Sequence, residues 1–205
     1  MPMPPTQRDH LRALAGEKAV LRALDLRAAG IAATTIQRAV ADGELVRLGR
    51  GLYQSPAADL DADFTLAEVS QRIPKGVIAM TSALAFHGLT DQIPRQVWVA
   101  IGARDWSPVV GHPPVRIIRF ADRFLHQGIE RHTVSGVEVR VYSVAKTLAD
   151  IFRNSRLIDR SVAVEGLKAA LAQRKATPAS IADAAQAGGA WRIMRPYLEA
   201  LTFNG

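Results

Sequence analysis

The sequence has no cysteine among its 205 residues. Disulfide bonds, cysteine-ligated zinc fingers and catalysis by a thiol are therefore excluded. Long apolar stretches are also missing, since no run approaches the roughly 20 residues that a membrane-spanning helix needs. Residues 1–6 are rich in proline, and charged residues follow instead of the apolar core of a signal peptide. We therefore expect a cytoplasmic protein with no membrane partner.

Lysine is scarce, because only five of the 26 Lys and Arg residues are lysine and 21 are arginine. With 19 acidic residues, the formal net charge is +7. Arginine bonds phosphates and guanine edges through two parallel donors, so this composition favours contact with nucleic acid. A GC-rich genome would also favour arginine codons and leave an ordinary basic surface. Charge alone does not separate these two explanations.

Motifs for catalysis and for metal or phosphate binding are incomplete. Ser143 and Lys146 have the spacing of a Ser-x-x-Lys nucleophile, but its Ser-Asp-Asn and Lys-Thr-Gly partner motifs are missing. Ser143 is better explained as the N-cap of an apolar helix. Residues 49–51 lack the Gly-Lys-Ser/Thr ending of a phosphate-binding loop, and His126 and His132 are too isolated for a metal site. We expect no catalytic residue, no metal and no cofactor.

One enzymatic alternative stays open, a metal-dependent nuclease built on Asp122 and Glu138. Glu138-Val-Arg140 follows the Glu-x-Lys pattern of some nucleases, with arginine in place of the lysine. An ion pair on the surface of a sheet explains Glu138 and Arg140 better than a nuclease site does.

The chain divides at residues 55–63, a small, acidic, proline-bearing stretch that indicates a linker or a capped helix entry. We predict a DNA-binding domain over residues 1–54, a linker over 55–63 and a larger domain over 64–205. The fold class is therefore α+β, with an N-terminal winged helix-turn-helix followed by a small sheet with several helices.

Two short helices separated by a tight turn are predicted in the first domain. Residues 7–24 have apolar spacing compatible with one or two helices, and residues 25–30 form a very short helix that ends at a glycine. The next helix, residues 34–42, is capped by Thr34 or Thr35 and ends at Gly43. Its inner face is expected to hold Ile36, Ala39 and Val40. This arrangement is typical of a helix-turn-helix.

A β-hairpin is predicted directly after the second helix, within residues 44–54, with its tip at 49–51. A hairpin in this position is a wing, and Tyr53 is expected to pack in the core or at a hinge. The helix would present base-contacting residues to the major groove, and the wing would meet phosphates or a minor groove. The predicted DNA-binding residues are Thr34, Thr35, Gln37, Arg38, Arg47 and Arg50.

Three segments resemble the AbiEi family of antitoxin regulators from type IV, abortive-infection toxin–antitoxin operons. They are GELVRLGRGLY at 43–53, SALAFHGL at 82–89 and YSVAKTLADIF at 142–152. The resemblance implies a repressor of its own operon that binds double-stranded DNA at inverted repeats in the promoter. It also implies neutralisation of a nucleotidyltransferase-like toxin by way of the C-terminal domain. An orphan regulator with no toxin, or a protein-interaction module, is the alternative.

The larger domain is predicted as helices with a small antiparallel or mixed sheet. One helix over 81–87 is capped by Thr81 or Ser82 and ends at Gly88, and His87 is expected to be a buried or capping residue. Strands cover 97–101 and 115–120, a hairpin joins 129–134 to 137–142, and helices start near Ser143, Ser161, Thr177 and Ala190.

Arginines are dense around these predicted strands and include Arg104 and Arg140. A second DNA surface or a toxin-docking face is one interpretation, and an ordinary solvated basic surface is the one we favour slightly. Arg116 and Arg119 differ by three, so on a regular strand they face opposite sides. The candidate second-contact residues are Arg95, Arg116, Arg119, Arg123 and Arg131.

Overall fold

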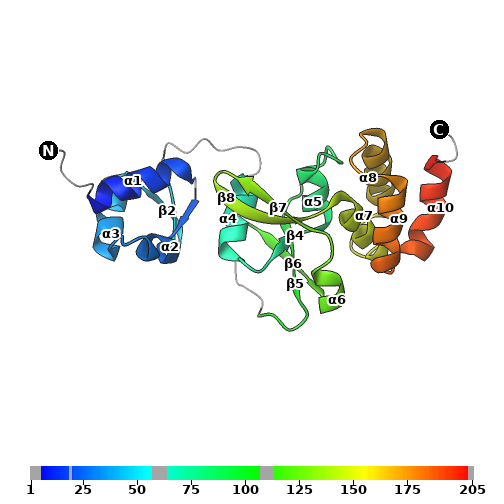
Figure 1. The fold of residues 1–205 in the computed structure, drawn as a ribbon, viewed down its shortest axis with the longest axis horizontal. Helices are drawn as coiled ribbons and strands as arrows, with labels where there is room; N and C mark the ends of the chain where they lie inside the picture. The colour runs from blue at the N-terminus through cyan, green and yellow to red at the C-terminus, as the bar shows by residue number, and fades with distance from the viewer. Residues whose placement is uncertain (1–5, 19, 57–63, 107–112, 203–205) are drawn as a thin grey trace. The chain divides into compact units, whose positions relative to one another are not determined.

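The computed structural model describes residues 6–18, 20–56, 64–106 and 113–202. The chain forms two compact units, the first of Met1–Pro74 with Thr133–Val139 and the second of Lys75–His132 with Arg140–Gly205. Each unit has its own apolar core, and helices and strands occur in both (Figure 1). The predicted α+β fold class is confirmed. Most of the predicted linker, 55–63, lies outside the described residues, so the domain boundaries stay a prediction.

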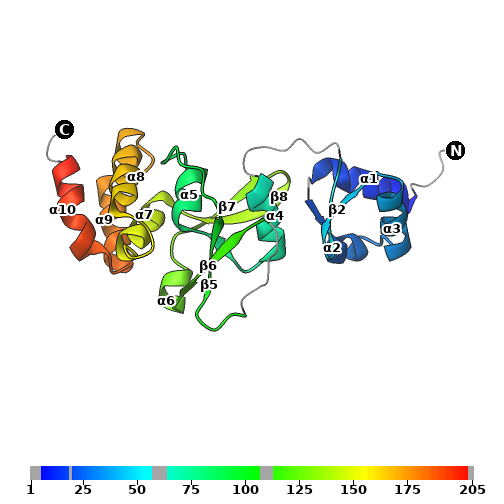
Figure 2. The same ribbon diagram turned by 180° about the vertical axis from the view of Figure 1, so that it is seen from behind.

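The first unit combines a helix-turn-helix with a small antiparallel sheet. Its sheet has the strand order β1-β3-β2, from β1 (Val20–Arg22), β2 (Val46–Gly49) and β3 (Leu52–Gln54). Its helices are α1 (Gln7–Glu17), α2 (Ala23–Ala28), α3 (Ala33–Ala41) and α4 (Phe64–Arg72). Figure 2 shows α1, α2 and α3 around β2 of this sheet.

The helix-turn-helix core consists of one apolar face from each helix. Leu11, Leu26 and Ile36 are each at most 2% exposed and belong to one buried cluster. Burying each such side chain contributes about 1.5–3 kcal/mol. Ala39 is also buried and Val40 packs against the cluster, which confirms the predicted inner face of α3.

Two predictions about local structure in the first unit are wrong. Residues 20–22, predicted within a helical stretch, form the strand β1, which pairs Leu21 with Tyr53 of β3. The α3 helix begins earlier than expected, because its N-cap is Ala32 rather than Thr34 or Thr35. Its end is as predicted, with Gly43 at φ 74°, a left-handed conformation that glycine adopts at little cost.

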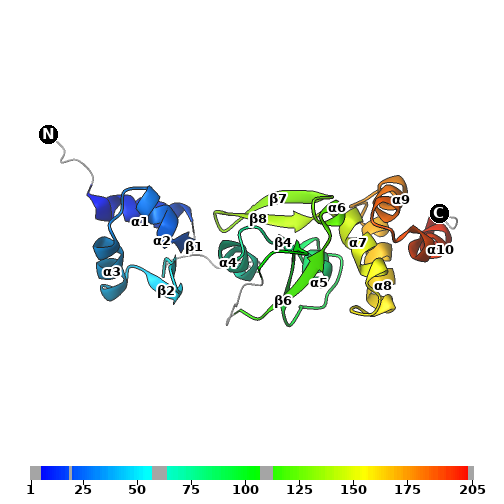
Figure 3. The same ribbon diagram turned by 90° about the horizontal axis from the view of Figure 1, so that it is seen from below.

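The second unit is built on a five-stranded mixed sheet with the order β6-β5-β4-β8-β7. The parallel pairs are β5 with β6 and β4 with β8, whereas β4 and β5 are antiparallel. The predicted hairpin of β7 and β8 is confirmed at its exact bounds (Figure 3). The strands are β4 (Val77–Ile78), β5 (Val97–Gly102), β6 (Val115–Phe120), β7 (Ile129–Val134) and β8 (Val137–Tyr142).

Helices α7 to α10 gather into one group in the second unit (Figure 1), with α7 packed against α5, α8 and α9. Ser143 caps α7 and Thr177 caps α9, both as predicted. The cap predicted for α5 is wrong, because this helix begins at Met80 after Ala79. The helices are α5 (Met80–Phe86), α6 (Asp122–Leu125), α7 (Val144–Arg153), α8 (Arg160–Ala172), α9 (Pro178–Ala187) and α10 (Trp191–Thr202).

Helix length and hydropathy also bear on membrane insertion. Among the helices in the described residues, none has both the length and the apolar character needed to cross a bilayer.

Candidate nucleic-acid interface

The α3 helix has one anchored face and one open face. Ile36 and Ala39 are 2% and 0% exposed, so they fix the helix to the core. Thr34, Gln37 and Arg38 are exposed on the outside. Within the described residues, the side chain of Arg38 has no hydrogen bond or ion pair. The guanidinium of Arg38 therefore has all its donors available for an external partner.

The N-terminal end of α3 is held by a side chain from α1. The Oε1 atom of Gln7 accepts hydrogen bonds from the Ala32 backbone N–H at 3.1 Å and the Thr35 hydroxyl at 3.0 Å. Ala32 has no side-chain acceptor of its own, so Gln7 supplies a cap from a distant part of the chain. Thr35, predicted to contact bases, is half-buried and its hydroxyl proton is already engaged.

The C-terminal end of α3 is also tied to α1, here by ion pairs. Arg8 bonds Asp42, and its Nε lies 2.9 Å from the Glu44 carboxylate. Arg12 bonds the other oxygen of Glu44. Hydrogen bonds from Arg8 and then Arg12 lower the pKa of Glu44 to about 2. Helix α1 therefore clamps α3 at both ends.

These ion pairs also set the local charge of the surface. Asp42 and Glu44 are the acids next to the open face of α3, and both are compensated by arginines of α1. A phosphate backbone approaching Arg38 would otherwise meet two uncompensated carboxylates close by. The arrangement leaves the surface of α3 compatible with an anionic partner.

The wing presents two arginines at a tight hairpin. Arg50 and Gly51 form the turn between β2 and β3, with Gly51 at φ 69°. Arg50 is exposed and, within the described residues, has no bonded partner. Arg47 pairs with Tyr53 across the hairpin, and its Nε donates to the Gly49 carbonyl oxygen at 3.2 Å. Tyr53 packs against the core, as predicted.

All six predicted DNA-binding residues therefore lie in the first unit. Thr34, Thr35, Gln37 and Arg38 are on α3, Arg47 is on β2, and Arg50 is in the turn of the wing. The sequence interpretation missed Gln7, Arg8 and Arg12, which position α3 from α1. No local signal identifies these three residues, because their partners lie 25 to 36 positions away.

The second-contact arginines do not form one continuous set. Arg116 lies 4.3 Å from the Trp98 ring centroid, and Arg123 lies 4.6 Å from that of Phe124. Arg119 donates to three backbone carbonyls, so it already has a structural role. Arg95 is exposed before β5 and Arg131 is exposed on β7.

The features that suggested catalysis have structural explanations. The hydroxyl of Ser143 accepts from the Lys146 backbone N–H, and the Lys146 ammonium is bonded to Asp150 at 2.6 Å. His87 is the C-cap of α5 and bonds the Tyr142 carbonyl oxygen at 2.7 Å through Nε2. Over the described ranges, no three His, Cys, Asp or Glu residues form a cluster that could hold a metal ion.

Comparison with known proteins agrees with this geometry. The fold is similar to the crystal structure of the RV2827C protein from Mycobacterium tuberculosis, with a TM-score of 0.57 and 16% identity over 97% of this chain and 81% of that chain. A comparison with curated proteins finds no match. Residues 10–56 match a family described as a transcriptional regulator, AbiEi antitoxin. This family match includes α3 and the wing, and it ends before α4.

Proposed function

We propose that the protein is a sequence-specific repressor that binds double-stranded operator DNA through α3 and the wing. The observation that carries the proposal is the open face of α3, where Arg38 has no bonded partner in the described residues while α1 neutralises the neighbouring acids. A helix of this kind docks its N-terminal residues in the major groove.

Thr34, Gln37 and Arg38 are assigned to base edges in this proposal. Arg38 reading a guanine would contribute about 1–3 kcal/mol of discrimination. Arg47 and Arg50 are assigned to the DNA backbone, because the wing carries them on a hairpin that flanks α3 in sequence. A phosphate contact weakens binding to all sequences about equally.

The experiment measures fluorescence anisotropy on the protein's own promoter fragment and on a scrambled fragment across a salt series. Arg38→Ala should weaken promoter binding by about 1–3 kcal/mol and scrambled binding much less. Arg50→Ala should weaken both and reduce the salt slope by about 1. Arg192→Ala, an exposed arginine of α10, is the matched control. Wild-type binding by the Arg38→Ala, Arg50→Ala double variant would refute the proposal.

The promoter site is expected to contain inverted repeats, and binding there would repress the protein's own operon. A reporter under this promoter should be repressed by the wild-type protein and released by Arg38→Ala. Repression that persists in this variant would contradict autoregulation through α3.

We further propose that the second unit neutralises a nucleotidyltransferase-like toxin, as the AbiEi resemblance implies. The exposed arginines Arg95, Arg116, Arg123 and Arg131 are the candidate contacts on this unit. The product of the neighbouring gene should co-purify with the protein, and Arg95→Glu with Arg123→Glu should disrupt the complex while Arg192→Glu does not. The protein is an orphan regulator instead if it binds its operator but the neighbouring gene product does not co-purify with it. In that case it should also fail to rescue the growth of cells that express this gene product.

A further inference from the structure

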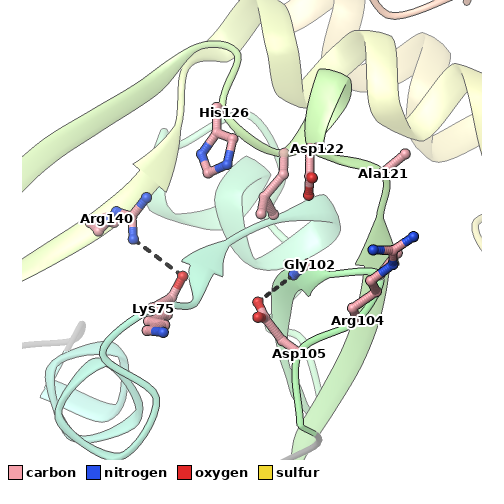
Figure 4. Close-up of a pocket in the computed structure, with 10 residues that line it drawn as sticks. Lys75, Gly102, Arg104, Asp105, Ala121, Asp122, His126 and Arg140 are labelled. Atoms are coloured by element: carbon pink, nitrogen blue, oxygen red, sulfur yellow. Dashed lines mark hydrogen bonds between the residues drawn. The ribbon is translucent and has the colours of Figure 1, made fainter.

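The second unit contains a cleft that the proposed DNA-binding and antitoxin roles do not use. Its volume is about 680 Å³, within the roughly 300–1,000 Å³ typical of small-molecule sites. The lining residues come from the ends of β5 and β6, from the start of β4, and from α6 and β8 (Figure 4). Because β5 and β6 are parallel, their carboxyl ends lie at the same edge of the sheet, and the cleft lies at this edge. Open sheets with parallel strands commonly bind ligands at the carboxyl ends of their strands.

One wall of the cleft is held rigid by a residue outside it. Arg119 donates to the carbonyl oxygens of Gly102, Ala103 and Asp105 at 3.1, 3.2 and 2.6 Å. The Asp105 carboxylate in turn accepts the Gly102 N–H at 2.8 Å. The segment after β5 is therefore fixed before any ligand binds, which lowers the entropic cost of binding.

The basic groups of the cleft lack ion-pair partners. Lys75, Arg104 and Arg140 line it, and within the described residues none of them forms an ion pair with a carboxylate. The Nη1 atom of Arg140 donates to the Lys75 carbonyl oxygen at 3.2 Å, whereas its Nε is buried without a hydrogen-bond partner. A buried, unpaired guanidinium N–H is costly unless something else accepts from it. The Nε itself has no solvent access, so a ligand can accept only from the Nη groups of Arg140 that face the cleft, and an anion with several oxygens, such as a phosphate, suits these donors.

The opposite side of the cleft offers a carboxylate. Asp122, at the start of α6, is exposed and points toward the cleft beside His126 (Figure 4). A carboxylate accepts hydrogen bonds and repels a phosphate, so Asp122 would contact hydrogen-bond donors in another part of the ligand. Sugar hydroxyl groups are donors of the right kind, and they lie a few bonds from the phosphate in a phosphorylated sugar.

We propose that this cleft binds a phosphorylated sugar, the moiety that sugar phosphates and nucleotides share. Arg140 and Lys75 bind the phosphate, and Asp122 accepts hydrogen bonds from the sugar hydroxyls. Gly102, Ala103 and Ala121 leave the space between these groups open because their side chains are small or absent.

Isothermal titration calorimetry on the full chain tests the proposal with four probes: inorganic phosphate, ribose, ribose 5-phosphate and adenosine 5′-monophosphate. Ribose 5-phosphate should bind more tightly than inorganic phosphate or ribose. Adenosine monophosphate binding more tightly again would identify a nucleotide as the ligand, and equal or weaker binding would identify a sugar phosphate. No saturable binding of either phosphorylated sugar, or phosphate binding as tightly as ribose 5-phosphate, would overturn the proposal.

Variants locate the binding within the molecule. Arg140→Gln should weaken ribose 5-phosphate by about tenfold or more, as expected for one lost charge-assisted interaction. Asp122→Asn should weaken ribose 5-phosphate but not inorganic phosphate. Arg95→Gln removes the same charge outside the cleft and should change nothing. Lys75→Gln, at an exposed position of the cleft, should also weaken ribose 5-phosphate, and it tests the site without changing Arg140.

The basic surface of the first unit is a competing site for phosphate. The Arg38→Ala, Arg50→Ala double variant should therefore bind ribose 5-phosphate like the wild-type protein. If binding is lost in this double variant and kept in Arg140→Gln and Lys75→Gln, the cleft is not the site and the proposal is wrong. This result is independent of operator binding, which the promoter titration measures.

Discussion

The ion pairs that hold α3 in the first unit lie at the surface, whereas in the second unit a lysine and an aspartate pair inside the core with an arginine beside them. Arg8 and Glu44 have side chains that are 35% and 26% exposed. Lys146 and Asp150 are 3% and 1% exposed, and Arg153 lies 3.2 Å from the same carboxylate oxygen of Asp150. Pairs of one basic and one acidic side chain therefore act at two very different degrees of solvation.

The difference follows from what each unit does with its surface. A surface pair contributes little to stability and is weakened by salt, yet it fixes the orientation of α3 while Arg38 stays exposed. A buried pair has a large desolvation cost, so removing one partner is severe. Burial is also the main cause that raises the pKa of Asp150 and lowers that of Lys146. The second unit thus depends on its charges for stability, and the first unit depends on them for geometry.

The largest effect is expected from Asp150→Ala in the second unit. This change leaves Lys146 buried without its carboxylate partner, which should lower the free energy of unfolding by about 3–5 kcal/mol. All three tryptophans, Trp98, Trp106 and Trp191, belong to the second unit. Urea denaturation followed by tryptophan fluorescence therefore reports on this unit selectively.

A double variant provides the control for Asp150→Ala. Lys146→Met with Asp150→Leu replaces both charges by apolar groups and should recover most of the lost stability. If the double variant is no more stable than Asp150→Ala, packing rather than the unpaired charge explains the loss, and the contrast between the two units disappears.

A slightly smaller effect is expected from Ile36→Ala, at the inner face of α3. The side chain is 2% exposed, so truncation leaves a cavity and should cost about 2–5 kcal/mol. Operator binding should be lost because α3 is no longer held, which the anisotropy assay measures. Ile36→Val removes a single methylene and should cost only about 0.5–1.5 kcal/mol. Equal losses from the two variants would contradict the packing assigned to this position.

Gln7→Ala is expected to cost about 1 kcal/mol, the usual effect of removing a helix cap. The Ala32 N–H and the Thr35 hydroxyl lose their acceptor, so the amide of Ala32 should exchange with solvent faster in hydrogen-exchange measurements. Gln7→Glu keeps a side-chain oxygen in the same place and should retain the protection. Unchanged exchange in Gln7→Ala would show that Gln7 does not cap α3.

Gln7 also shows why part of the interface could not be predicted from the sequence. The hairpin of β7 and β8 was predicted at its exact bounds, because alternating valines and a Ser135-Gly136 turn are local signals. The inner face of α3 was predicted equally well from the spacing of Ile36, Ala39 and Val40. In each case the information lies within a few residues of the element it determines.

The wrong predictions concern elements whose partners are distant in sequence. The strand β1 has three residues and pairs with β3, which lies about 30 positions later, so no alternation pattern identifies it. The start of α3 was misplaced because the sequence offers two threonines as local caps, whereas the acceptor at this end is Gln7. The pairing of Arg8 and Arg12 with Asp42 and Glu44 depends on the same tertiary contact.

The smallest effect is expected from Glu44, and it depends on pH. Its pKa is lowered from the ordinary value of 4.5 to about 2 by bonds from Arg8 and Arg12. A carboxylate with a lowered pKa stabilises the folded state above pH 4.5, and this stabilisation is lost as the pH falls from 4.5 through about 2. The thermal midpoint of the first unit should therefore decrease over this range, and the decrease should be smaller in high salt because the pair is partly exposed.

Glu44→Gln separates this contribution from the other acids of the first unit. The pKa of Asp9 is also lowered, chiefly by the Thr6 hydroxyl, so some acid sensitivity should persist in the variant. Glu44→Gln should flatten the pH dependence of the midpoint, whereas Glu17→Gln, at an exposed acid at the end of α1, should not. An identical pH profile for wild type and Glu44→Gln would mean that the surface pairs do not hold α3, and the geometric role of charge in the first unit would have to be abandoned.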